Sequence, residues 1–188
     1  MKPMIKLCNQ PDGNYLMLGL GGGALLHALQ YHLNNPTFDV VEINPEVIDI
    51  AKQYFYLDKI NTANIFQEDA NLYITSCKKK YDVILVDIYQ DKTYPKHCAT
   101  QTFFQACQKL LKQDGIIAIN CANMSQYKLL LNQLRSVFNN AILTIRVAHP
   151  RNVILTATNQ PFQTLLNRVQ LKDLDWHEQS GAFGTLKE

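Results

Sequence analysis

An apolar segment that begins at Tyr15 runs directly into a glycine cluster at residues 19–23, and a helical pattern follows from Ala24 to Tyr31. This order predicts a strand, a tight turn and a helix whose first amide groups stay open. Glycines permit the positive φ angles of such a turn, and the missing Cβ atoms let the backbone approach a ligand closely. The segment therefore predicts the first βα unit of an open α/β sheet, with a ligand site at the turn.

A second apolar strand follows this unit and ends in a carboxylate, in the segment Phe38–Glu42. In nucleotide-binding α/β folds, an acidic side chain at this place accepts hydrogen bonds from ribose hydroxyls. The glycine turn and the acid together predict a ligand of the adenosine type.

Strand and helix patterns alternate along nearly the whole chain, and the strands are continuous apolar runs, as parallel strands covered on both faces are. Strands are predicted at residues 15–19, 38–42, 63–67, 82–87, 115–120, 141–147 and 152–158, and helices at about 23–33, 45–56, 70–77, 99–113, 124–138 and 161–170. Only a short turn joins the last two strands, so these should pair antiparallel. The pattern predicts a doubly wound, mostly parallel seven-stranded sheet of the methyltransferase-type Rossmann class that ends in an antiparallel hairpin.

Length and composition bound the class of protein. The 188 residues suit a lead-in at 1–14, one nucleoside-binding domain at 15–172 and a loose tail at 173–188 around Trp176. A net charge of +2 predicts no nucleic-acid partner, and no apolar run is long enough to span a membrane. The five cysteines lack metal-ligand spacing, which predicts reduced thiols, no metal site and a cytoplasmic location.

Four predicted strand ends carry polar or glycine residues, and ligands of open α/β sheets bind beyond the carboxyl ends of the strands. We therefore expect one cleft that binds the nucleoside through Gly19, Gly21, Gly22, Gly23, Glu42, Asp69 and Ala70. Asp87 should face the reacting centre, where a carboxylate can orient an amine and accept its proton. A purely structural role stays open for single residues, such as capping of the following helix by Asp69.

The loop after Asp87 adds Tyr89, Gln90, Tyr94 and His97 to the predicted substrate pocket. Two roles stay open for the two tyrosines, which either form a wall of the pocket or pack loop 88–98 against the sheet. His97 is either a base near the cleft or a structural side chain.

Three segments of the chain resemble the spermidine synthase family. Residues 41–49 are similar to its second-strand motif, residues 81–87 to its fourth strand with the catalytic aspartate, and residues 94–104 to its Pro-x-His-x-x-Thr-x-x-Phe-Phe stretch. The likeness covers about residues 14–158. It implies a transferase of polyamine biosynthesis that binds S-adenosylmethionine or decarboxylated S-adenosylmethionine and passes an aminopropyl group to a small-molecule amine. In this family's pattern Asp87 helps with the proton, Glu42 holds the ribose and Asp69 holds the adenine.

The chain departs from the family pattern at several places. The family reads Gly-Gly-Gly-Asp-Gly-Gly in the first loop, where its aspartate binds the amine tail of the donor, and Gly22 stands at that place here. Gln90 replaces a second aspartate, and the family's N-terminal β-domain is not expected. Two alternatives therefore stay open: a methyltransferase, which Gly22 favours, and a catalytically silent nucleoside-binding or dimerisation module. A homodimer is also open, whereas a nicotinamide dehydrogenase fits poorly because Ala24 replaces the last motif glycine.

Overall fold

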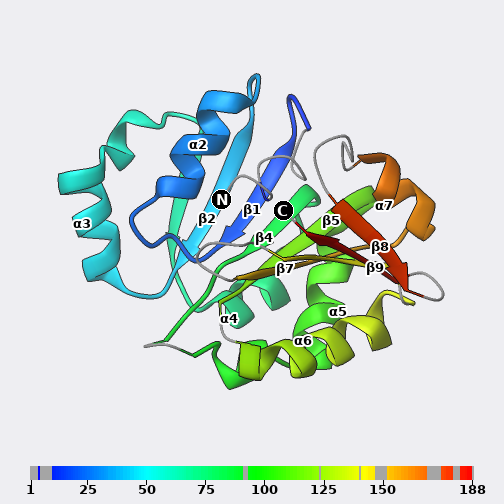
Figure 1. Ribbon diagram of the computed structural model, residues 1–188. Helices are drawn as coiled ribbons and strands as arrows, with labels where there is room; N and C mark the ends of the chain where they lie inside the picture. Colours follow the sequence, from blue (N-terminus) through cyan, green and yellow to red (C-terminus); the bar gives the residue numbers. More distant parts are fainter. Residues whose placement is uncertain are drawn as a thin grey trace.

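The computed structural model describes residues 4, 10–90, 93–122, 124–139, 141–146, 152–168, 175–179 and 183–187. One sheet of nine strands runs through this part of the chain in the order β3-β2-β1-β4-β5-β7-β6-β9-β8 (Figure 1). The strands are β1 (Asn14–Leu18), β2 (Thr37–Glu42), β3 (Ala63–Gln67), β4 (Tyr81–Val86), β5 (Leu111–Cys121), β6 (Ile142–Arg146), β7 (Val153–Thr158), β8 (Asp175–Gln179) and β9 (Phe183–Lys187). Strands β1 to β5 are parallel, and β7 pairs antiparallel with both β5 and β6.

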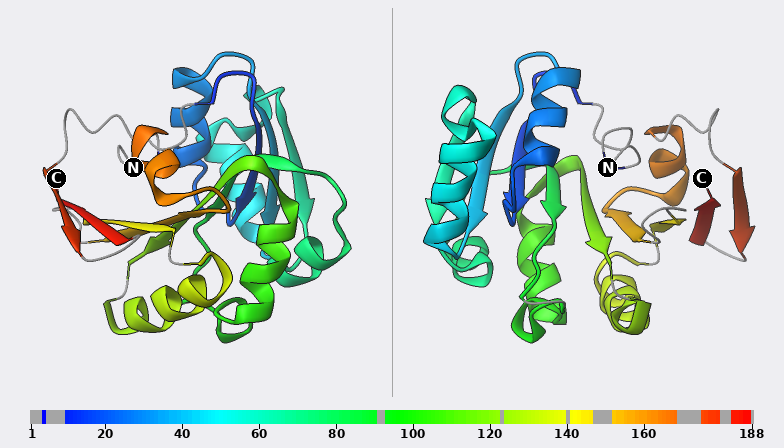
Figure 2. Two further views of the ribbon diagram at one scale, coloured as in Figure 1. Left: turned by 90° about the vertical axis from the view of Figure 1, so that its right-hand side faces the viewer. Right: turned by 60° about the vertical axis from the view of Figure 1, so that its left-hand side comes forward.

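Helices cover both faces of the sheet, as Figures 1 and 2 show. One face carries α2 (Ala24–His32), α3 (Pro45–Phe55) and α7 (Phe162–Arg168), and the other carries α4 (Ala70–Ser76), α5 (Gln101–Leu110) and α6 (Met124–Val137). Two short 3-10 turns, η1 (Leu57–Lys59) and η2 (Lys96–Cys98), complete the connections. The doubly wound arrangement predicted from the sequence is confirmed.

The continuous apolar runs follow from burial on both sides of the sheet. Successive strand residues point to opposite faces, so Met17 of β1 packs in the core under α2 and α3 while Leu16 and Leu18 pack in the core over α4 and α5. Neither face of a central strand meets water, so apolar residues are favoured at every position.

The predicted elements are all present, with two differences. The helix predicted at 99–113 ends at Leu110, because residues 111–121 form β5 and pair with β4. The loose tail predicted at 173–188 is wrong for its described residues, which form β8 and β9. Strand β9 pairs in parallel with β6 and covers an edge that would otherwise expose unpaired backbone groups. Because this pairing uses backbone atoms, weak side-chain periodicity did not reveal it.

No helix within the described residues combines the length and the apolar character needed to cross a bilayer.

Strand β2 contains a buried carboxylate, Asp39, which is only 3% exposed. It accepts hydrogen bonds from the Lys79 ammonium at 2.6 Å, the Tyr81 hydroxyl at 2.8 Å and the Asn64 amide at 2.9 Å. Burial alone raises the pKa of Asp39, but these three donors outweigh it and lower the pKa below its ordinary value. The ionised carboxylate therefore stabilises the folded state.

We expect the substitution Asp39→Asn to reduce the free energy of unfolding at neutral pH by about 1–3 kcal/mol, as loss of a satisfied buried acceptor does. Since the pKa is lower in the folded than in the unfolded state, the stabilisation is complete above the unfolded pKa and disappears as the pH falls through the folded pKa. Urea unfolding at neutral and acidic pH measures both effects. The exposed Asp49 gives the control Asp49→Asn, and an equal loss in both variants would contradict a special role for Asp39.

Candidate functional site

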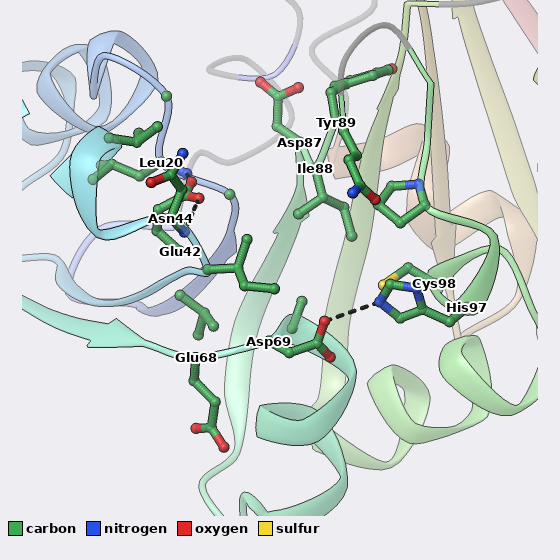
Figure 3. A pocket seen from close by; sticks show the side chains of 18 residues that line it. Leu20, Glu42, Asn44, Glu68, Asp69, Asp87, Ile88, Tyr89, His97 and Cys98 are labelled. Atoms are coloured by element: carbon green, nitrogen blue, oxygen red, sulfur yellow. Dashed lines mark hydrogen bonds and ion pairs between the residues drawn. The ribbon is translucent and has the colours of Figure 1, made fainter.

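A cavity of about 590 Å³ opens at the carboxyl ends of β1, β2, β3 and β4 (Figure 3). Most of the predicted site residues line it, namely Gly19, Gly21, Glu42, Asp69, Ala70, Asp87, Tyr89, Gln90 and His97. Further lining residues are Leu20, Val41, Ile43, Asn44, Val47, Glu68, Ile88, Pro95 and Cys98. The strand ends therefore meet in one cleft, because the carboxyl ends of parallel strands share an edge of the sheet.

The glycine loop presses its backbone against the end of β4. Gly19 has a φ of +95°, and a Cβ atom there would lie 2.2 Å from the carbonyl oxygen of Asp87. The Asp87 amide donates a hydrogen bond to the Leu18 carbonyl at 2.8 Å, which holds the two strand ends together. Only glycine fits this contact and this φ angle.

The same loop leaves amide hydrogens open. Within the described residues, neither Gly21 nor Gly22 donates its amide hydrogen to an acceptor. Helix α2 starts directly after Gly23, and it has no side-chain cap and no acid in its first turn. A helix N-terminus with free amide groups attracts a negatively charged ligand group.

Two predicted nucleoside-binding glycines lie outside the cavity lining. Gly23 is the N-cap of α2, with a φ of +73°. A Cβ atom on Gly22 would meet the ring of Phe55, at the end of α3, at 3.6 Å. Their contact with a nucleoside stays a prediction.

Both oxygens of Glu42 accept backbone hydrogen bonds. The amide of Leu20 donates to Oε2 and the amide of Asn44 donates to Oε1, each at 3.0 Å. Because each carboxylate oxygen has two lone pairs, one remains on each oxygen. The Glu42 carboxylate is thereby fixed in orientation and can accept from two further hydroxyl groups.

Asp69 links two sides of the cavity. Its Oδ1 accepts from the amides of Asn71 at 2.9 Å and Leu72 at 3.1 Å and so caps α4. Its Oδ2 lies 3.0 Å from Nε2 of His97 on η2, the pair drawn with a dashed line in Figure 3. Asp69 therefore has the capping role that the sequence left open and also borders the cavity, while His97 is its partner.

Asp87 follows β4 and borders the cavity beside the glycine loop. Burial raises the pKa of its carboxyl group, and a hydrogen bond from Asn120 partly opposes this effect. The Asn120 amide lies 2.9 Å from Oδ1 of Asp87, and Asn152 donates in turn to the Asn120 side-chain oxygen at 2.9 Å. Sequence reasoning missed both asparagines, although Asn120 directly follows an apolar strand run beside the β4 run.

The two tyrosines of loop 88–98 differ in role. Tyr89 lines the cavity, donates its hydroxyl hydrogen to the Asn120 carbonyl at 2.6 Å and accepts from the Ala122 amide. Tyr94 does not line the cavity but is fully buried, with its ring centre 6.3 Å from that of Tyr89, and the Gln126 side chain bonds both its backbone groups. Packing is therefore the role of Tyr94, and Tyr89 has both roles that the sequence left open.

Among the residues that the structure describes, no three His, Cys, Asp or Glu side chains are grouped so as to hold a metal ion. The cysteine that borders the cavity, Cys98, is buried, which raises the pKa of its thiol to about 12 and keeps it in the unreactive protonated form.

The family model of the spermine/spermidine synthase domain matches residues 5–155, which is most of the chain. The chain belongs to the spermine/spermidine synthase domain family. The sequence resemblance is thereby confirmed. This synthase-domain chain spans 67%, 60% and 54% of the length of polyamine aminopropyltransferases from Vibrio vulnificus, Chromobacterium violaceum and Neisseria meningitidis.

Two classes of transferase occur among the relatives of this synthase-domain protein. The Vibrio vulnificus polyamine aminopropyltransferase is 28% identical over 93% of this chain and 67% of its own length. The N-terminal histidine N-methyltransferase of Emericella nidulans is 35% identical over 73% of this chain and 25% of its own.

Solved structures give the same division. Human methyltransferase-like protein 13 in complex with SAH is similar with a TM-score of 0.74 and 26% identity, over 90% of this chain and 83% of that one. Spermidine synthase from Thermotoga maritima has a TM-score of 0.70 and 22% identity, over 84% of this chain and 57% of that one. The synthase-domain protein thus shares its fold with a methyltransferase-like protein that was solved with SAH and with a spermidine synthase.

Proposed function

We propose that this protein binds S-adenosylmethionine in the cavity and transfers its methyl group to an amine nitrogen. The glycine loop is the observation that carries the proposal. It presents at the N-terminus of α2 the amide hydrogens of Gly21 and Gly22, which no described residue accepts, and it contains no acid. The intact donor has a carboxylate on its amino-acid tail, which such amides stabilise, whereas the decarboxylated donor has only a cationic amine there.

The remaining cavity residues fit the adenosine half of the same ligand. Glu42 has one free lone pair on each oxygen for the two ribose hydroxyls. Asp69 Oδ2, which already pairs with His97, has a second lone pair for the adenine amino group. Val41 and Ile43 supply apolar surface beside them. The cavity volume of about 590 Å³ lies in the range of small-molecule sites.

Asp87 is the group that acts on the acceptor. The donor supplies a methyl group on a sulfonium, so the leaving group needs no protonation. Asp87 accepts a hydrogen bond from the incoming amine, so that the nitrogen lone pair points at the methyl carbon. As the new carbon–nitrogen bond forms, the sulfur–methyl bond breaks to leave S-adenosylhomocysteine, and Asp87 takes the proton from the nitrogen. Burial makes Asp87 a stronger base than an exposed aspartate.

Aminopropyl transfer is the second candidate, and the family match and the Vibrio vulnificus relative favour it. Asp87 would act on the amine in the same way, and the two reactions would differ in the tail of the donor. The cavity must then hold a cationic amine without an acid at Gly22.

Calorimetric titration with S-adenosylhomocysteine and with methylthioadenosine, the two leaving groups, tests the proposal. We expect S-adenosylhomocysteine to bind at least about tenfold more tightly, because only this ligand has the carboxylate tail. Mass spectrometry of amine acceptors should then show added methyl groups. Tighter binding of methylthioadenosine with aminopropyl products would support the second candidate. Binding without any product would leave a silent nucleoside-binding module.

The substitution Gly22→Asp separates the two donors within one protein. The new side chain starts 3.6 Å from the Phe55 ring, at a residue without a positive φ angle, so the variant should fold. We expect this substitution to lower the affinity for S-adenosylhomocysteine about tenfold, because the new carboxylate repels the tail carboxylate, and to leave the affinity for methylthioadenosine unchanged. Gly22→Asn, of the same size but neutral, is the matched control. Equal losses for both ligands would contradict binding of the tail at this loop.

A further inference from the structure

We propose that Asn120 and Asn152 form a relay of two side-chain amides that positions Asp87 and holds its carboxylate in the ionised form. This inference rests on the proposed function only for the role of Asp87 in the reaction, because the hydrogen bonds among the three side chains are present without a substrate. Neither asparagine lines the cavity, so both act through Asp87 rather than on a ligand.

Strand register brings the three residues together from distant parts of the chain. In the parallel pair of β4 and β5, Val86 lies opposite Ile119, so the next residues, Asp87 and Asn120, are also neighbours. In the antiparallel pair of β5 and β7, Cys121 lies opposite Val153, which places Asn152 beside the same strand end.

The direction of the hydrogen bonds follows from the chemistry of the groups. An ionised carboxylate only accepts hydrogen bonds, so the NH₂ group of Asn120 must face Asp87. This leaves the Asn120 oxygen on the other side, where the Asn152 NH₂ group donates to it at 2.9 Å. Asn152 therefore opposes a flip of the Asn120 amide, which would turn an oxygen toward the carboxylate.

The backbone that carries Asn120 is held as well. The Tyr89 hydroxyl donates to the Asn120 carbonyl and accepts from the Ala122 amide. Burial raises the pKa of this phenol to about 12, so Tyr89 stays neutral beside Asp87. The other ionisable groups that line the cavity are Glu42 at the end of β2, Glu68 and Asp69 between β3 and α4, and His97 and Cys98 of η2.

Two opposing effects therefore act on Asp87. Burial favours the protonated acid, whereas the amide hydrogens of Asn120 favour the carboxylate. The balance gives a carboxylate that is ionised when an amine arrives and still basic enough to take its proton. Without the relay, the effect of burial would lose this opposition, so the pKa of Asp87 would rise further and the carboxyl would hold its own proton at higher pH.

A double-mutant cycle tests the relay. The variants are Asn120→Ala, Asn152→Ala and the double substitution, and the first readout is a carbon NMR titration of the Asp87 carboxyl in the full chain without ligand. We expect both single substitutions to move the titration to higher pH, Asn120→Ala more strongly. The double variant should move no further than Asn120→Ala alone, because Asn152 acts through Asn120.

Asn159→Ala is the matched control. Asn159 accepts a hydrogen bond from the Gln108 amide just beyond the other end of β7, so this variant also loses an amide pair but should leave the Asp87 titration unchanged. An unchanged titration in Asn152→Ala, or additive shifts in the double variant, would overturn the relay. Should Asn120→Ala not fold, Asn152→Ala against Asn159→Ala decides the question.

The second readout separates the relay from the proposed function. On the acidic side of the pH profile, we expect kcat/KM for transfer to fall about tenfold in Asn120→Ala, in line with loss of a hydrogen bond to a charged group. Asn152→Gln keeps a side-chain amide, so we expect it to lower kcat/KM less than Asn152→Ala does. A shifted NMR titration without turnover of any amine would keep the relay and refute the transferase role of Asp87.

Discussion

The substitution Asp87→Asn is expected to lower kcat for transfer by about 10²–10⁴-fold, the usual contribution of a positioned general base. Asparagine keeps the size of the side chain at the cavity wall, but it cannot take a proton from the amine. Its amide would also meet the NH₂ group of Asn120, which lies 2.9 Å from Asp87 Oδ1. Steady-state kinetics measure kcat, and calorimetry should show affinity for S-adenosylhomocysteine within about threefold of the original protein.

The comparison variant for Asp87 is Glu42→Gln. Glu42 accepts two backbone amides and is proposed to hold the ribose, so its substitution should weaken ligand binding more than it lowers kcat. The two variants thus separate chemistry from binding. If Asp87→Asn kept the full rate, the site would work by positioning alone, and the base role would be withdrawn.

The substitution Gly19→Ala is expected to destabilise the protein by about 3 kcal/mol or more. The added Cβ would lie 2.2 Å from the Asp87 carbonyl oxygen, and the backbone has a φ of +95°. Relief would need β1 and β4 to separate, but they are neighbours in the sheet and the Asp87 amide bonds the Leu18 carbonyl at 2.8 Å. Urea unfolding measures the loss directly.

Two nearby glycines give a graded control for this experiment. At Gly21 nothing lies within 4 Å of an added Cβ, and the strain comes only from a φ of +53°, so the cost should be about 1 kcal/mol. At Gly22 the φ is not positive and the nearest atom is 3.6 Å away, so Gly22→Ala should be close to neutral. A Gly19→Ala variant as stable as Gly22→Ala would show that the strand ends can move apart.

Local sequence patterns were sufficient to predict most of the fold. Apolar runs at residues 83–86 and 116–119 indicated parallel strands because both faces of such strands are buried. The glycine cluster after Leu18 indicated a tight turn before a helix. Since parallel strands end at one edge, the acids Glu42 and Asp87 could also be placed in one cleft before any side chain was located.

The partners of these side chains depended on tertiary structure. Asn120 and Asn152 reach Asp87 only through the register of β4, β5 and β7, and His97 meets Asp69 only after η2 packs beside α4. Likewise Tyr94 turns into the core, and β9 covers β6. The identity of a residue and its spacing determine which element forms and at which end a polar group stands. The direction of a side chain and the atom it meets depend on contacts between segments far apart in the chain, which no local pattern encodes.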